Sequence, residues 1–220
     1  MNADQQILVA RVQMPERGQF LVRVEDGLVQ DGTVTPDTTG RFVVALDYGE
    51  DVGCVVCVEP YDPQRHGTKP PGFRLVRPLS GQDERIASDN VKLAEVMRTV
   101  LLGKVGNASD LRIASVRLSF GQKRLFVKYV SDNIKPDFSD AQDSLRSLYG
   151  VDVSVRAIGP RDEIAEFGGL GPCGRVCCCC SWQNRFPQRI SPDRCAASVM
   201  TMNGTCGRFK CCLAFERDGQ

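Results

Sequence analysis

Residues 111–130 have the sequence LRIASVRLSFGQKRLFVKYV, and this stretch decides the fold. Apolar residues in its first half recur at a spacing that suits a strand: Leu111, Ile113, Val116 and Leu118. Residues 121–122 then provide a turn, and residues 125–130 form a second apolar run. Short alternating runs of this kind are typical of strands. The stretch therefore predicts two adjacent strands joined by a tight turn.

Helices are predicted on both sides of this hairpin, over residues 83–102 and 136–149. The first has helical spacing at Ile86, Val91, Leu93, Ala94, Met97 and Leu101 and stops at Gly103. Two further strands are predicted over residues 73–77 and 151–158. The order β-α-β-β-α-β is that of the ferredoxin-like arrangement, in which four strands form one sheet and both helices cover one face. We therefore expect an α+β protein with a ferredoxin-like domain over residues 73–158.

Short apolar runs broken by glycine fill residues 1–59. The runs are residues 7–10, 20–24, 42–46 and 54–58. Because the glycines between them have turn-like spacing, we expect a small antiparallel β barrel as an N-terminal β domain. Residues 60–72 are rich in proline and polar residues and have no apolar period, which predicts a linker between two domains.

The composition is that of a folded and nearly neutral protein. The 220 residues are 42% hydrophobic, and 28 basic against 27 acidic residues leave a net charge of +1. No field of the whole molecule therefore recruits nucleic acid or an anionic membrane. The N-terminus lacks a basic segment followed by an apolar one, and no later run stays apolar for about 18 residues. We expect a cytoplasmic protein without membrane insertion, in which 11 cysteines indicate metal binding or thiol chemistry rather than disulfides.

Nine of the eleven cysteines gather in residues 159–220, the expected Cys-rich C-terminal segment. The pattern C-G-R-x-x-C-C occurs there twice, at residues 173–179 and 206–212. The two copies align without a gap and pair Cys173, Cys178 and Cys179 with Cys206, Cys211 and Cys212. Glycine after the first cysteine permits a turn with positive φ, in which amide groups can point at sulfur. Converging thiolates at this spacing indicate a metal or cluster site.

The ligand pattern distinguishes less clearly between an iron-sulfur cluster and zinc. Structural zinc sites usually use C-x-x-C knuckles, often with histidine, whereas the single histidine here, His66, lies in the expected linker. All-sulfur ligation by C-x-x-x-x-C-C favours an iron-sulfur cluster, with zinc as the second hypothesis and metal-free thiols as the third. The six repeated cysteines exceed the four that one cubane needs. Either two of them are not ligands, or two clusters are completed by other cysteines or by a partner chain.

The cysteines outside the repeat have other interpretations. Cys54 and Cys57 lie in an apolar run, where positions three apart face opposite sides of a strand. We therefore expect both to be buried thiols that bind no metal. Cys177 and Cys180 are either packing residues or spare ligands, and Cys195, between the two copies, is a less favoured ligand candidate.

Catalytic and RNA-binding motifs are not favoured by the sequence. It has no Gly-rich phosphate loop, no H-E-x-x-H and no nucleophile elbow, so we expect a protein that is not an enzyme. Residues 126–129 match the end of an RNA-recognition motif, but residues 122–125 lack the glycine and the first aromatic residue of that motif. Direct RNA binding by this sheet is therefore expected to be weak or indirect. The charged residues 161–163 are typical of a solvated helix start.

Three stretches carry a resemblance to a known family: IGPRDE at residues 158–163, GGLGPCGR at 168–175 followed by Cys178-Cys179, and GTCGRFKCCLAFE at 204–216. Through them the chain resembles the bacterial RicT (YaaT) proteins. These contain the PSP-one C-terminal domain (polymerase suppressor protein), which would cover about residues 73–158 here. The chain departs from the family pattern in five extra cysteines: Cys54, Cys57, Cys177, Cys180 and Cys195.

The resemblance implies a non-enzymatic regulatory subunit of a cytoplasmic complex that carries 4Fe-4S clusters. Its implied partners are RicA- and RicF-like subunits and RNase Y, and its implied processes are mRNA processing, sporulation, competence and biofilm formation. It also implies the ligand candidates Cys173, Cys178, Cys179, Cys206, Cys211 and Cys212. The alternative from another class is a structural zinc protein that binds nucleic acid directly through its Arg-rich tail.

Overall fold

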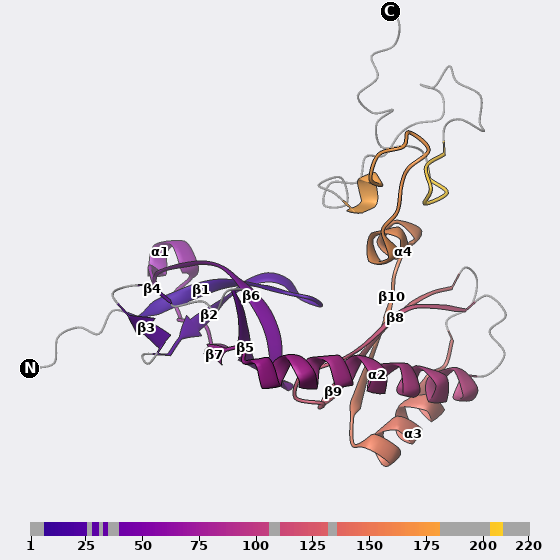
Figure 1. Ribbon diagram of the computed structural model, residues 1–220, viewed down its shortest axis with the longest axis horizontal. Helices are drawn as coiled ribbons and strands as arrows, with labels where there is room; N and C mark the ends of the chain where they lie inside the picture. The colour runs from indigo at the N-terminus through magenta and orange to yellow at the C-terminus, as the bar shows by residue number, and fades with distance from the viewer. Residues whose placement is uncertain are drawn as a thin grey trace, which may run out of the picture. The chain divides into compact units, whose positions relative to one another are not determined.

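The computed structural model describes residues 7–25, 28–30, 33–34, 40–105, 111–131, 136–180 and 203–208. The chain divides into two compact units. The first comprises Met1–Lys104, Arg117–Phe126 and Ser139–Ser154, and the second comprises Val105–Val116, Val127–Phe138 and Val155–Gln220. Helices and sheets are both present, so the expected α+β class is confirmed (Figure 1).

Five strands of the first unit close into a β barrel (Figure 1). Their order around it is β1 (Leu8–Met14), β2 (Gly18–Val24), β7 (Arg74–Pro78), β5 (Arg41–Leu46) and β6 (Gly49–Pro60). Neighbouring strands are antiparallel, except that β2 and β7 run parallel. Inward-facing side chains form an apolar core of Ala10, Val12, Met14, Val22, Val24, Phe42, Val44 and Leu75. A separate short hairpin pairs β3 (Val29–Gln30) with β4 (Thr33–Val34).

The strand β7 differs from the prediction, which placed residues 73–77 in the ferredoxin-like sheet. It pairs with β2 and β5, and the Phe73 carbonyl just before it accepts a hydrogen bond from the Arg23 amide at 2.8 Å. Because a closed barrel leaves no strand edge unpaired, this strand completes the barrel. The expected four-stranded ferredoxin-like sheet is therefore not confirmed. The segment before β7, expected to be a linker, contains the short helix α1 (Pro63–His66).

A three-stranded sheet is formed by β8 (Arg112–Leu118), β9 (Arg124–Val130) and β10 (Asp152–Ala157), with β9 in the centre. The first two are the strands of the predicted hairpin, and Gln122 in their turn has a φ of 54°. The strands β9 and β10 run in the same direction. The Asp152 amide bonds to the Lys123 carbonyl at 2.9 Å, and the Ile158 amide bonds to the Tyr129 carbonyl at 2.8 Å, in step along both strands.

The helix α2 (Gly81–Lys104) begins with reciprocal capping. The Asp83 carboxylate accepts hydrogen bonds from the Ser80 amide (2.8 Å) and hydroxyl (2.7 Å), and the Ser80 hydroxyl accepts one from the Asp83 amide (3.3 Å). Arg77 of β7 adds a bidentate ion pair to Asp83. The helix α3 (Ser139–Tyr149) packs against α2 (Figure 1). No helix among the described ranges is long and apolar enough to cross a membrane.

Asp83→Asn is expected to lower the free energy of unfolding at neutral pH by about 1–2 kcal/mol. The Arg77 guanidinium holds the pKa of Asp83 well below its usual range. A carboxyl with a depressed folded-state pKa contributes stability that is complete above its unfolded pKa of about 4 and is lost as the pH falls through the folded value. The gap between wild type and variant should therefore shrink in acid. Urea midpoints from about pH 7 to about pH 2 check this, and a constant gap would contradict it.

A buried ion pair joins the β8–β9 hairpin to the barrel. The Arg117 guanidinium of β8 donates to Asp51 at 3.0 and 2.8 Å and to Glu16 at 3.1 Å, and it lies 4.8 Å from the centre of the Phe126 ring. The Tyr48 hydroxyl donates to Asp51 at 2.9 Å. Although burial disfavours its charge, the two carboxylates raise the pKa of Arg117, while burial and Asp51 raise the pKa of Tyr48. Arg117 therefore stays charged between its two partners.

Cys54 and Cys57 in β6 were expected to be buried on opposite faces of a strand, and this expectation is wrong because both are exposed. The register between β1 and β6 shifts: Arg11 lies opposite Cys57, but Val12 lies opposite Val55. One extra residue of β6 thus interrupts the alternation as a β-bulge. Residues three apart on either side of a bulge can face the same way, and these two thiols both reach solvent.

Candidate metal centre

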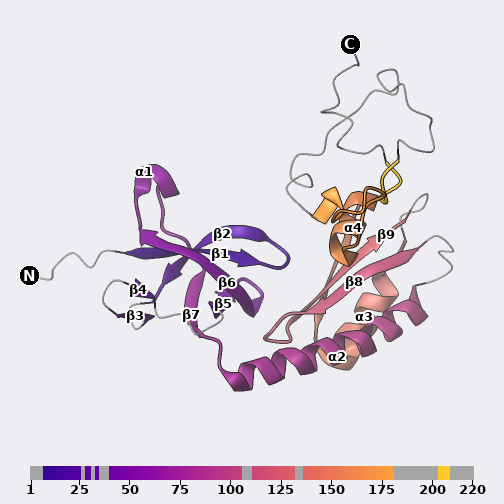
Figure 2. The ribbon, with the colours of Figure 1, turned by 45° about the horizontal axis from the view of Figure 1, so that its top comes forward.

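The helix α4 (Pro160–Phe167) leads into the cysteine-rich segment and supports it. Proline and two acidic residues in its first turn favour a helix start there, as the sequence predicted. Glu163 pairs with Arg112 of β8 at 3.1 Å, and Glu166 pairs with Lys128 of β9. These ion pairs hold α4 beside the ends of two strands of its own unit (Figure 2). The loops that follow therefore start from a fixed position.

The first copy of the repeat forms a tight turn. The Gly171 amide donates to the Arg175 carbonyl at 2.7 Å, and the Gly174 amide donates to the Gly171 carbonyl at 2.9 Å. Gly174 has a φ of 75°, which L-residues rarely adopt. A β-bridge between Leu170 and Val176 closes the turn.

The second copy forms the same turn. The Gly204 amide donates to the Arg208 carbonyl at 2.8 Å, and the Gly207 amide donates to the Gly204 carbonyl at 2.9 Å. Gly207 has a φ of 70°, so the positive φ expected after the first cysteine is found in both copies. The Cys206 sulfur lies over Gly204, as the Cys173 sulfur lies over Gly171. The sequence repeat is thus a repeat of backbone structure.

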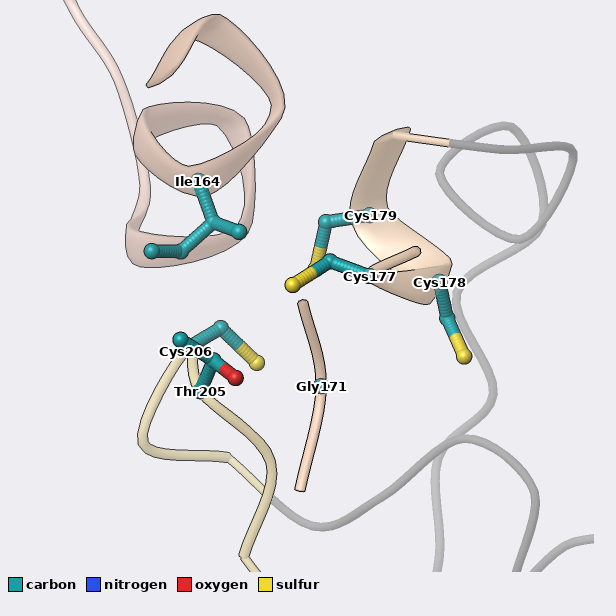
Figure 3. Close-up of a pocket in the computed structure, with 7 residues that line it drawn as sticks. All are labelled: Ile164, Gly171, Cys177, Cys178, Cys179, Thr205 and Cys206. Carbon is teal, nitrogen blue, oxygen red and sulfur yellow. The ribbon is translucent and has the colours of Figure 1, made fainter. Parts of the chain in front are cut away.

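A cavity of about 40 Å³ lies where α4 and the two turns meet (Figure 3). Four cysteines line it, Cys177, Cys178, Cys179 and Cys206, together with Ile164, Gly171 and Thr205. The Thr205 hydroxyl donates to the Leu170 carbonyl at 3.3 Å, which holds the second turn against the first. Thiols far apart in the sequence therefore line the same cavity.

The predicted ligands are only partly gathered at this cavity. Cys179 is buried and Cys206 is half-buried, and both line it. Cys178 also lines it, but its sulfur points away from the centre (Figure 3). Cys173 is exposed and is not part of the lining. Cys211 and Cys212, like Cys195, lie outside the described residues.

One residue at the cavity was not singled out by the repeat. Cys177 immediately precedes the 3-10 turn Cys178–Cys180. It is buried, and its sulfur points into the cavity (Figure 3). Cys180 is exposed, and its thiol donates to the Ile164 carbonyl at 3.4 Å. The run of four adjacent cysteines in the sequence pointed to this part of the chain, but it did not determine which of the four face the cavity.

The donors at the cavity suit a soft metal, because four of the residues that line it carry thiol groups. Within the described ranges, no three His, Cys, Asp or Glu side chains form a group that could hold a metal ion. His66 takes no part in the cavity lining, and its Nδ1 accepts a hydrogen bond from the Asp62 amide at 3.0 Å. The chemistry of the site therefore fits thiolate ligation, with ligands still to be added to those described.

The aromatic residues of β9 are used in packing. The Phe126 ring lies 5.3 Å from that of Tyr48, and the Tyr129 ring lies 5.1 Å from that of Phe138, measured between ring centres. Tyr129 and Phe138 are both buried. Tyr129 is therefore not available as a platform on which a nucleotide base could stack.

The chain is similar to the stage 0 sporulation protein YaaT of Bacillus subtilis (strain 168). It is 26% identical over 145 residues, which cover 66% of this chain and 50% of the relative. This similarity bears out the predicted resemblance to the RicT (YaaT) proteins. The chain spans about half the length of this relative. No protein-family model matches the chain, so the PSP-one domain stays a prediction, and no solved structure matches it.

Proposed function

We propose that this chain is a regulatory adaptor of the RicT (YaaT) kind whose C-terminal repeat holds an iron-sulfur cluster. The observation that carries the proposal is the pair of equivalent glycine turns, which bring Cys206 to the same cavity as the buried Cys177 and Cys179. A bound cluster would supply a redox-sensitive and oxygen-sensitive link between the two copies. The remaining thiolates would come from Cys211 and Cys212 or from a partner chain.

The turns also provide electrostatic support for bound thiolates. Each turn is closed by two backbone hydrogen bonds and holds a glycine at positive φ, a backbone conformation that also occurs in anion-binding loops. Arg175 and Arg208 follow the two glycines and carry positive charge next to the sulfur-bearing residues. Negative charge on a thiolate cluster is therefore balanced locally.

The partners in this proposal come from kinship. The relative is named for sporulation, and a regulatory role in development is the coarse function that this name supports. We extend it to RicA- and RicF-like subunits and RNase Y, with an influence on mRNA processing in the cytoplasm. The chain would act by binding and would catalyse no reaction of its own.

Structural zinc is the second candidate, and one observation favours it. The cavity of about 40 Å³ is small, which suits a single ion better than a four-iron cluster. In this alternative the metal only ties the turns together, and the Arg-rich tail binds nucleic acid directly.

Anaerobically purified protein is expected to be brown and to contain iron and acid-labile sulfide in similar amounts, because soft thiolates without histidine favour a cluster. Metal and sulfide analysis of the full chain checks this. The double variant Cys54→Ala with Cys57→Ala is the matched control, since these exposed thiols of the barrel should leave the metal content unchanged. Stoichiometric zinc without sulfide would replace the first candidate by the second, and absence of both metals would reject the two together.

A further inference from the structure

The four adjacent cysteines at residues 177–180 cannot all serve one centre. Cys178–Cys180 form a 3-10 turn, which has three residues per turn. Consecutive side chains along such a turn therefore point about 120° apart. Of three consecutive side chains, two can therefore point toward the side of the cavity while the third points away from it.

The two members directed into the cavity are Cys177 and Cys179. Their exposed fractions are 4% and 7%, and their sulfurs lie on the side of Ile164 and Cys206 (Figure 3). The sulfur of Cys178 points the other way. The pair that faces the cavity thus differs in one member from the adjacent pair in the repeat, Cys178 and Cys179.

The backbone holds Cys177 in this orientation. Its amide donates to the Gly169 carbonyl at 3.0 Å, in the segment that follows α4, and its carbonyl accepts from the Cys180 amide at 2.9 Å. These two hydrogen bonds therefore hold Cys177 to the segment that follows α4 and to the 3-10 turn. Cys177 is therefore a buried thiol with a fixed backbone that points into a cavity also lined by the second copy of the repeat. Metal ligands are held in place by their surroundings in this way.

We propose that Cys177, which lies outside the repeated pattern, is a ligand of the bound metal group. The inference rests on the proposed thiolate-ligated centre and adds a ligand that the family pattern does not contain. Cys180 is excluded from the set, because it is exposed, lies outside the cavity lining, and donates its thiol to the Ile164 carbonyl.

The test compares three variants of the full chain, purified without oxygen: Cys177→Val, Cys177→Ala and Cys180→Val. Valine keeps an apolar side chain of similar size, and alanine removes the sulfur without adding bulk. Both Cys177 variants are expected to retain about a tenth or less of the wild-type iron, or zinc, per chain, because even outer contacts of metal ligands matter by about tenfold or more. Cys180→Val should keep its metal. The far-ultraviolet circular dichroism spectrum checks that each variant is folded.

The outcomes separate the possible roles of Cys177. Loss of metal in both folded Cys177 variants supports ligation. Loss in Cys177→Val with retention in Cys177→Ala would show that only bulk matters, and wild-type metal in both would show that Cys177 is a packing residue; either result overturns the inference while the metal centre stands. Wild-type protein without any metal would instead remove the proposed centre, and the inference with it.

Discussion

Arg117→Ala is expected to lower the free energy of unfolding by about 3–5 kcal/mol, the cost of leaving a buried charge without its partner. The side chain of Asp51 is only 2% exposed, and it loses both guanidinium hydrogen bonds in this variant. Glu16 loses its ion pair at the same time, and the Phe126 ring loses the cation that lies 4.8 Å from its centre. The hydrogen bonds that remain, from the Tyr48 hydroxyl and from the Val52 and Phe120 amides, supply no full positive charge.

Urea unfolding at neutral pH measures this loss. The matched control is Arg146→Ala, which removes an arginine from a pair whose two side chains are 65% and 58% exposed in the same unit. An exposed pair contributes about 0–1 kcal/mol, because water screens it. Equal losses in the two variants would show that the charge on Asp51 is satisfied in another way.

The hairpin at residues 111–130 could be predicted because its signal is local. Alternation, the turn at Gly121 and the return run all lie within one stretch, and the structure shows β8 and β9 there. The helix α2 was predictable for the same reason, because the helical spacing of its apolar residues lies within one stretch.

The strand β7 could not be assigned in this way. Five residues with strand-like composition do not specify which sheet they join, and that choice depends on pairing with β2 and β5, which lie far away in the sequence. The bulge in β6 is equally hidden, because it arises from the register with β1 and not from any residue type. The burial of Cys54 and Cys57 was predicted from an apolar strand with regular alternation of its side chains. A single extra residue in the strand reverses that alternation.

The site shows the same division between local and distant information. The repeat indicated the conformation of each turn, because glycine after the first cysteine permits a positive φ. The structure has a positive φ at both glycines, Gly174 and Gly207. It could not specify which of the adjacent cysteines face inward, because this depends on the 3-10 turn and on the contact of Cys177 with the segment after α4. The sequence therefore predicted the candidate centre, and the tertiary structure determines which thiols face the cavity.

Replacing Gly174 and Gly207 together by alanine is expected to cost about 2–4 kcal/mol in the stability of the two turns and to lower metal occupancy severalfold. Alanine in the left-handed region costs roughly 1–2 kcal/mol per residue, and both glycines lie there, at φ of 75° and 70°. Crowding is not the cause, because an added Cβ at either position meets no atom within 4 Å. The turns orient the cysteines, so metal content per chain is the more direct measurement, with protease sensitivity of residues 168–208 as the second.

Asparagine at the same two positions is the matched control. It also adds a Cβ and a polar group, but it tolerates the left-handed region better than alanine does. If the handedness of the turns is what the metal centre requires, the asparagine variant should keep more metal than the alanine variant. Equal loss in both would mean that the absence of a side chain matters, as it would if a partner chain approached the backbone closely here. Equal retention would mean that the two turns do not position the ligands, and the structural equivalence of the repeat would then be unconnected with metal binding.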